Sequence, residues 1–65
     1  MRIDRKKLVM AMIERDLNQT ELAKKAGVSR VTVNGIKNGR GCCYETGVAL
    51  AKALGMPLDD LLEEV

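Results

Sequence analysis

Apolar residues recur along this chain with the spacing of short helices that bury one face. Two such stripes lie on either side of Gly27, and together they comprise Leu22, Ala23, Ala26, Val28, Val33 and Ile36. Residues three or four positions apart share one face of a helix, so the pattern predicts helices over residues 19–26 and 30–37. Glycine tolerates the positive φ of a sharp turn between helices, so we expect the two to meet across Gly27.

Polar residues before both helices support this interpretation. Asn18 and Glu21 have the spacing of a capping box, and Ser29 stands where it can cap the second helix. Two short helices joined by a tight turn form a helix-turn-helix. We therefore predict this unit at the centre of the chain.

The same periodicity predicts three further helices. Asp4 caps a first helix over residues 5–15, whose core-facing stripe is Leu8, Val9, Met12 and Ile13. A helix over residues 45–54 ends at Gly55 and buries Val48, Leu50, Ala51 and Leu54. A fifth helix starts at Pro57, and its apolar face is Leu58, Leu61, Leu62 and Val65. With no strand-like alternation and no repeat, the prediction is an all-α, compact five-helix fold forming one domain over residues 1–65.

Composition restricts the kind of protein. The 65 residues are 46% hydrophobic, which is too apolar for a disordered tail, and with no Phe or Trp the core must be aliphatic. No apolar run approaches the roughly 20 residues that span a bilayer. The N-terminal apolar run covers only residues 8–13 and lacks a small-residue cleavage site, so we reject a signal peptide. We expect a cytoplasmic protein without a membrane partner.

Charge is divided unevenly along the chain. Residues 1–40 hold ten basic and four acidic side chains, whereas residues 41–65 hold one basic and five acidic ones. The basic part contains the predicted helix-turn-helix. Basic side chains also serve simply to solvate exposed helices, but their coincidence with this unit favours a face directed at a polyanion.

Candidate chemistry other than binding is sparse. The sequence has no histidine, and its only cysteines are the adjacent Cys42 and Cys43. A zinc site takes four ligands, so we expect no metal, and we expect the two thiols to stay reduced in the cytosol. Asp59 and Asp60 are better placed to complement a helix dipole than to act as a catalytic pair. We expect no enzyme activity, no cofactor and no small-molecule ligand.

The segment from Leu17 to Gly39, LNQTELAKKAGVSRVTVNGIKNG, together with LAKALGMPLDDLL near the end, resembles the Cro and repressor family of helix-turn-helix domains, also called the XRE-like family. The resemblance covers residues 8–62. It implies a lambda-repressor-like five-helix domain that binds double-stranded DNA as a transcriptional regulator. It also implies a dimer on a palindromic operator.

A helix fits the major groove, where each base pair shows a different pattern of donors and acceptors. With Val33 and Ile36 assigned to the core, the helix over residues 30–37 directs other side chains outward. The base-reading candidates, partly by similarity to the family, are Arg30, Val31, Asn34 and Gly35. Their alternatives are a phosphate contact for Arg30, partial burial against the next helix for Val31, and simple solvation for Asn34. Gly35 costs a helix about 1 kcal/mol relative to alanine. Either it allows a close approach to DNA, or it is a helical glycine without a function.

Phosphate contacts are expected at helix ends and from flexible cations. The candidates are Gln19, Thr20, Ser29, Thr32, Lys37, Asn38 and Arg40; for Gln19, Ser29 and Thr32 the family resemblance supports the assignment. Relatives often carry several basic residues in the following loop. Here the corresponding positions include Gly41, Cys42, Cys43 and Glu45, which departs from the family pattern.

Two further expectations concern partners. The apolar close of the chain suggests a homodimer held by Leu61, Leu62 and Val65. The rival functions are an antitoxin and a protein-binding module that retains the fold. A protein-binding module would show an acidic or apolar outer face on the third helix, which this sequence lacks.

Overall fold

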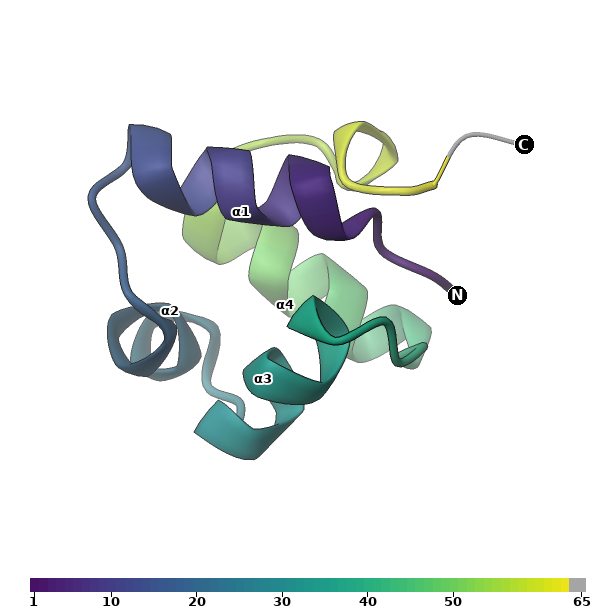
Figure 1. Cartoon of the computed structure of the whole chain (residues 1–65), viewed down its shortest axis with the longest axis horizontal. Coiled ribbons are helices and arrows are strands. Elements are labelled where there is room, and N and C mark those ends of the chain that lie inside the picture. Colours follow the sequence, from purple (N-terminus) through teal and green to yellow (C-terminus); the bar gives the residue numbers. More distant parts are fainter. Residues whose placement is uncertain (64–65) are drawn as a thin grey trace.

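The computed structural model describes residues 1–63 and shows a bundle of four α-helices (Figure 1). The helices are α1 (Arg5–Glu14), α2 (Gln19–Ala26), α3 (Arg30–Lys37) and α4 (Tyr44–Leu54), followed by the 3-10 turn η1 (Leu58–Asp60). No strand forms within residues 1–63, where strand-like pairing is limited to an isolated antiparallel bridge between Ile3 and Leu62. The predicted all-α class is confirmed.

The helix-turn-helix has the predicted bounds because its caps are all made. The Asn18 side chain accepts a hydrogen bond from the Glu21 N–H at 2.8 Å, and Glu21 accepts one from the Asn18 N–H at 3.1 Å. Gly27 ends α2 in the left-handed region with φ of 73°. Ser29 then accepts from the Thr32 N–H at 3.1 Å and starts α3. Local sequence thus sets both helix ends and the turn.

The predicted fifth helix is wrong. The segment after Pro57 makes one 3-10 turn and then runs extended beside the N-terminal residues. The Asp4 N–H donates to the Leu61 carbonyl at 2.7 Å, and the Glu63 N–H donates to the Arg2 carbonyl at 3.2 Å. These backbone groups pair with the other end of the chain, so they are not available for a further helical turn.

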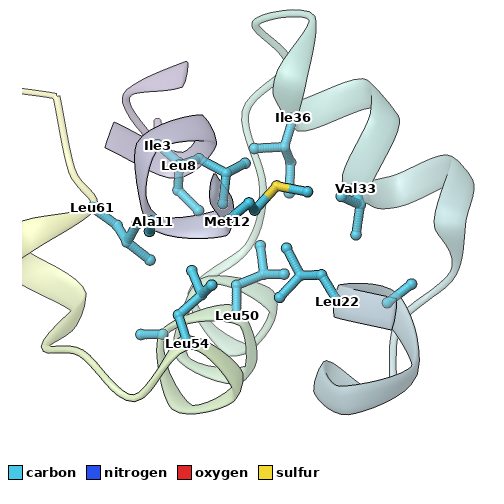
Figure 2. Packing of buried hydrophobic residues seen from close by; sticks show 12 residues of the cluster. Ile3, Leu8, Ala11, Met12, Leu22, Val33, Ile36, Leu50, Leu54 and Leu61 are labelled. Atoms are coloured by element: carbon cyan, nitrogen blue, oxygen red, sulfur yellow. The ribbon is translucent and has the colours of Figure 1, made fainter. Parts of the chain in front are cut away.

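An aliphatic core fills the space between the helices (Figure 2). Its largest fully buried side chains are Leu8, Leu22, Ile36, Leu50, Leu61 and Val33. The predicted stripe of α1 is wrong by part of a turn, because Ala11 is buried whereas Ile13 is 65% exposed and Val9 is only half-buried. On α4 the predicted Val48 is also half-buried, and Gly47 is buried instead.

The arrangement leaves α3 at one side of the molecule. In Figure 1, α2 and α3 lie below α1, and α2 packs against both α3 and α4. The N-terminal segment also holds the loop after α3, since the Cys42 N–H donates to the Met1 carbonyl at 2.9 Å and Arg2 donates to the Gly39 carbonyl at 3.1 Å. The end of α3 is therefore fixed to the body of the protein.

Candidate nucleic-acid interface

The outward face of α3 carries the predicted base-reading side chains. Val33 and Ile36 are buried in the core, which turns Arg30, Val31 and Asn34 toward solvent. Val31 is 75% exposed, so the alternative of burial against α4 is wrong. An exposed valine with no apolar neighbour to cover it is suited to meeting a thymine methyl group.

Two candidate side chains from different helices meet at this face. Gln19, in the first turn of α2, donates its side-chain amide to the Asn34 Oδ1 at 3.4 Å. The contact leaves the Asn34 Nδ2 group available as a donor, and its Oδ1 has a second lone pair. The Arg30 side chain makes no hydrogen bond or ion pair with any of residues 1–63, so its guanidinium is available to an external acceptor.

The hydroxyl groups at the start of α3 already serve the fold. Ser29 Oγ lies 2.9 Å from Thr32 Oγ1 and also accepts the Thr32 N–H. Ser29 is therefore first of all the cap of α3. Thr20, Asn38 and Arg40 are exposed, as predicted for contacts with phosphates, and Lys37 is half-buried.

Gly35 lies against the side chain of Arg40 in the structure. A Cβ at this position would lie 3.2 Å from Cδ of Arg40, and the Arg40 N–H donates to the Gly35 carbonyl at 2.9 Å. A shift of a few tenths of an ångström in the exposed Arg40 side chain would make room for a Cβ, so this contact alone does not require glycine. The assignment of Gly35 to base reading stays a prediction.

Two cations of α1 join the site although the sequence assigned them no contact. Arg5 and Lys6 line a groove of about 450 Å³ with Lys37 of α3, above Val9 and Met10. The third cation of that turn, Lys7, instead donates to the Leu62 carbonyl at 3.1 Å. Positive charges in the first turn of α1 are unfavourable, because the helix dipole has its positive end there. The fold brings Arg5 and Lys6 beside Lys37 of α3.

The adjacent cysteines have different surroundings. Cys42 packs against the core, and this burial raises the pKa of its thiol. Cys43 is exposed at the start of α4, where the Thr46 hydroxyl at 3.2 Å lowers the pKa of its thiol. No group of three or more His, Cys, Asp or Glu side chains gathers as a metal site within residues 1–63.

The cysteine environments predict selective alkylation. Because the thiolate is the nucleophile, the lowered pKa and exposure of Cys43 should make it react severalfold faster than Cys42 with iodoacetamide near neutral pH. Peptide mass spectrometry of a time course measures the two rates. Thr46→Val should slow Cys43 alone, whereas equal rates at both cysteines would contradict the assignment.

Two of the three residues predicted for dimerisation, Leu61 and Leu62, are engaged within the chain itself. Leu61 is fully buried in the chain's own core, so its predicted role at a dimer interface is wrong. Leu62 is half-buried and pairs through its backbone with Ile3. Val65 lies outside the described residues. Within residues 1–63, no helix has the length and apolar character needed to cross a membrane.

Comparison with known proteins agrees with this geometry. The sequence matches the family model described as helix-turn-helix over residues 8–61, which is most of the chain. The restriction-modification controller protein C.AhdI from Aeromonas hydrophila is similar in structure, with a TM-score of 0.84, 27% identity and 89% of each chain covered. A comparison with curated protein sequences found no match.

A second structural likeness is to part of a much larger protein. The whole chain superposes on a hydroxyethylphosphonate dioxygenase with a TM-score of 0.88 and 26% identity, but it spans only 14% of that enzyme. The family match and the similarity to the controller protein both concern the helix-turn-helix, whose second helix, α3, is exposed in this chain. The chain therefore belongs to the XRE-like helix-turn-helix family.

Proposed function

We propose that this protein is a repressor that binds a palindromic operator as a homodimer, with α3 of each copy in the major groove. The observation that carries the proposal is the exposed side of α3, where Arg30 has no partner within residues 1–63 and Asn34 is held by Gln19. Side chains that are exposed and held in one orientation, but do not stabilise the fold, are suited to contact an external ligand.

The three side chains suit different bases. Arg30 can donate two parallel hydrogen bonds to guanine O6 and N7, and Asn34 can pair with adenine N6 and N7. Gln19 fixes the Asn34 amide with its donor side free, which favours one orientation in the groove. Val31 adds contact with a thymine methyl. Together they define one half-site.

Cations around this face would hold the DNA backbone. Lys37 and Arg40 lie at the end of α3, and Arg5 and Lys6 stand beside Lys37. Thr20 and the free N–H groups at the start of α2 offer an uncharged phosphate contact. Such contacts position the protein, whereas the base edges specify the sequence.

Other functions have less support. An enzyme has little support, because the sequence has no histidine and the acidic side chains of residues 1–63 do not gather at one site. A protein-binding module is disfavoured by the polar and basic outer face of α3. An antitoxin would use the same DNA-binding face and would need an additional segment that binds the toxin. The cytoplasmic location stays a prediction from the sequence.

Two experiments test the proposal directly. Selection of bound sequences from a random duplex pool should recover a palindrome, and a reporter with that operator over its promoter should be repressed by the protein. Recovery of no preferred sequence would contradict sequence-specific recognition. Increased expression from the reporter would contradict repression.

The proposed backbone contacts predict strong salt dependence. If each monomer makes three or four charged contacts, log K should fall with log salt with a slope of about −3 per monomer, since each contact contributes about 0.9. Lys37→Ala should reduce the slope by about 1 per monomer. Fluorescence anisotropy from 50 to 300 mM salt measures it. Lys25→Ala, at the far end of α2, is the control, and an unchanged slope in Lys37→Ala would contradict the contact.

A further inference from the structure

The outer side of α4 carries a short apolar strip between two opposite charges. Leu50 and Leu54 of this helix point into the core (Figure 2). The opposite side presents Glu45, Val48, Ala49 and Lys52. These residues have the spacing i, i+3, i+4 and i+7, which forms one continuous stripe on a helix.

The rest of residues 1–63 covers this stripe only in part. Val48 and Ala49 are half-buried, but they lie outside the core cluster and the residues packed against it. Glu45 and Lys52 are exposed and form no ion pair within residues 1–63. With Tyr44, which is 66% exposed, the four residues line a shallow groove of about 300 Å³.

We propose that this stripe binds the same stripe of a second copy, with the two α4 helices antiparallel about a twofold axis at Val48 and Ala49. Each Glu45 then lies opposite Lys52 of the other copy, so the contact contains two ion pairs. A twofold interface requires a surface that complements itself. The acid–apolar–base order along α4 meets this requirement only when the helices run in opposite directions.

The spacing tolerates the common helix crossing angles. At a rise of about 1.5 Å per residue, Glu45 and Lys52 each lie about 5 Å along the helix from the proposed axis. Even a crossing of about 50° moves the opposed positions apart by only about 4 Å at that distance, which a lysine side chain can span. Small Ala49 near the axis permits close approach of the two backbones.

This inference rests on the homodimer of the proposed function and names its surface, in place of the buried Leu61. The stripe has only a few residues, whereas standard interfaces use about 20–30 residues on each side. We therefore expect a weak dimer in free solution that two adjacent half-sites on DNA would stabilise.

Charge reversal tests the proposed register. E45K alone places like charges opposite each other twice and should weaken self-association about tenfold in sedimentation at low salt, as should K52E alone. The double variant E45K/K52E should associate like the wild type. An equimolar mixture of the two single variants should also recover association, because each copy then supplies the charges that the other lacks.

A second pair of variants tests the axis itself. Val48→Glu places two carboxylates against each other and should reduce self-association more than either charge reversal. Ile13→Glu on α1, another exposed apolar position, is the matched control and should leave it unchanged. Circular dichroism shows that each variant is folded.

Several outcomes would overturn the inference. The first is a wild type that stays monomeric at millimolar concentration with and without operator. The second is a pair of single charge variants whose self-association is not restored by mixing. The third is a loss of self-association in Ile13→Glu that Val48→Glu does not show. Titration of a single half-site measures DNA recognition separately. Variants that leave the wild-type dimer intact would therefore contradict only the α4 contact, and a wild type that never dimerises would also contradict the proposed homodimer. Failed half-site binding would contradict DNA recognition by α3.

Discussion

Replacing Arg30 and Asn34 together by alanine is expected to reduce the preference for the operator over random duplex DNA by about 100-fold or more. Each well-placed bidentate contact to a base contributes about 1–3 kcal/mol of discrimination, and the double variant removes two of them. Binding to random DNA should fall much less, because it depends on phosphate contacts. Competition anisotropy with the selected operator and a scrambled duplex measures both affinities.

The variants can separate base reading from charge. Arg30→Lys keeps the cation but loses the planar fork of donors, so it should restore a phosphate contact better than a guanine contact. Both positions are exposed, so the melting temperature should change little. A double alanine variant that keeps the wild-type ratio between operator and random DNA would contradict the role of α3.

The largest effect on stability is expected from Leu22→Ala. Leu22 is fully buried and lies where α2 meets α3 and α4. Truncation of a buried leucine costs about 2–5 kcal/mol through lost transfer energy and the cavity left behind. A domain of this size has only about 3–10 kcal/mol of stability, so much of it would be lost. Urea denaturation followed by circular dichroism measures the free energy of unfolding.

A matched truncation at the surface provides the comparison. Ile13→Ala on α1 removes a similar side chain that is 65% exposed, and it should change the free energy of unfolding by less than about 0.5 kcal/mol. Equal losses in the two variants would contradict the core described here. DNA binding by Leu22→Ala should recover at low temperature if its defect is only one of stability.

The helix-turn-helix was predictable because its signals are local. Asn18 and Glu21 bond to each other within one turn, and Gly27 provides the left-handed residue that ends α2. Ser29 lies beside the N–H that it caps. Such interactions depend on a few neighbouring residues, so the bounds of α2 and α3 agreed with the prediction.

The faces of α1 and α4 were less predictable. Apolar residues at Val9 and Ile13 fit a core stripe as well as Ala11 does, and only the neighbouring helices determine which side is covered. In the folded protein the small residues Ala11 and Gly47 are buried, because they allow neighbouring segments to pack closely against α1 and α4. Periodicity gives the presence of a stripe, but tertiary contacts set its centre.

The candidate site divides in the same way. The exposure of Arg30, Val31 and Asn34 followed from the burial of Val33 and Ile36. The contact between Gln19 and Asn34 joins residues 15 positions apart, and no short-range pattern encodes it. The Arg40 N–H, by contrast, bonds to the Gly35 carbonyl within the local turn at Gly39 that ends α3.

By itself, the sequence determined the all-α class, the caps and the turn of the helix-turn-helix, and the outward side chains of α3, because these depend on residues within one or two helical turns. The tertiary structure alone decided that the chain end pairs with residues 2–4 instead of forming a helix, and that Arg5 and Lys6 stand beside Lys37. Both results bring together segments more than 30 residues apart, and their relative position is fixed only when the shared core closes.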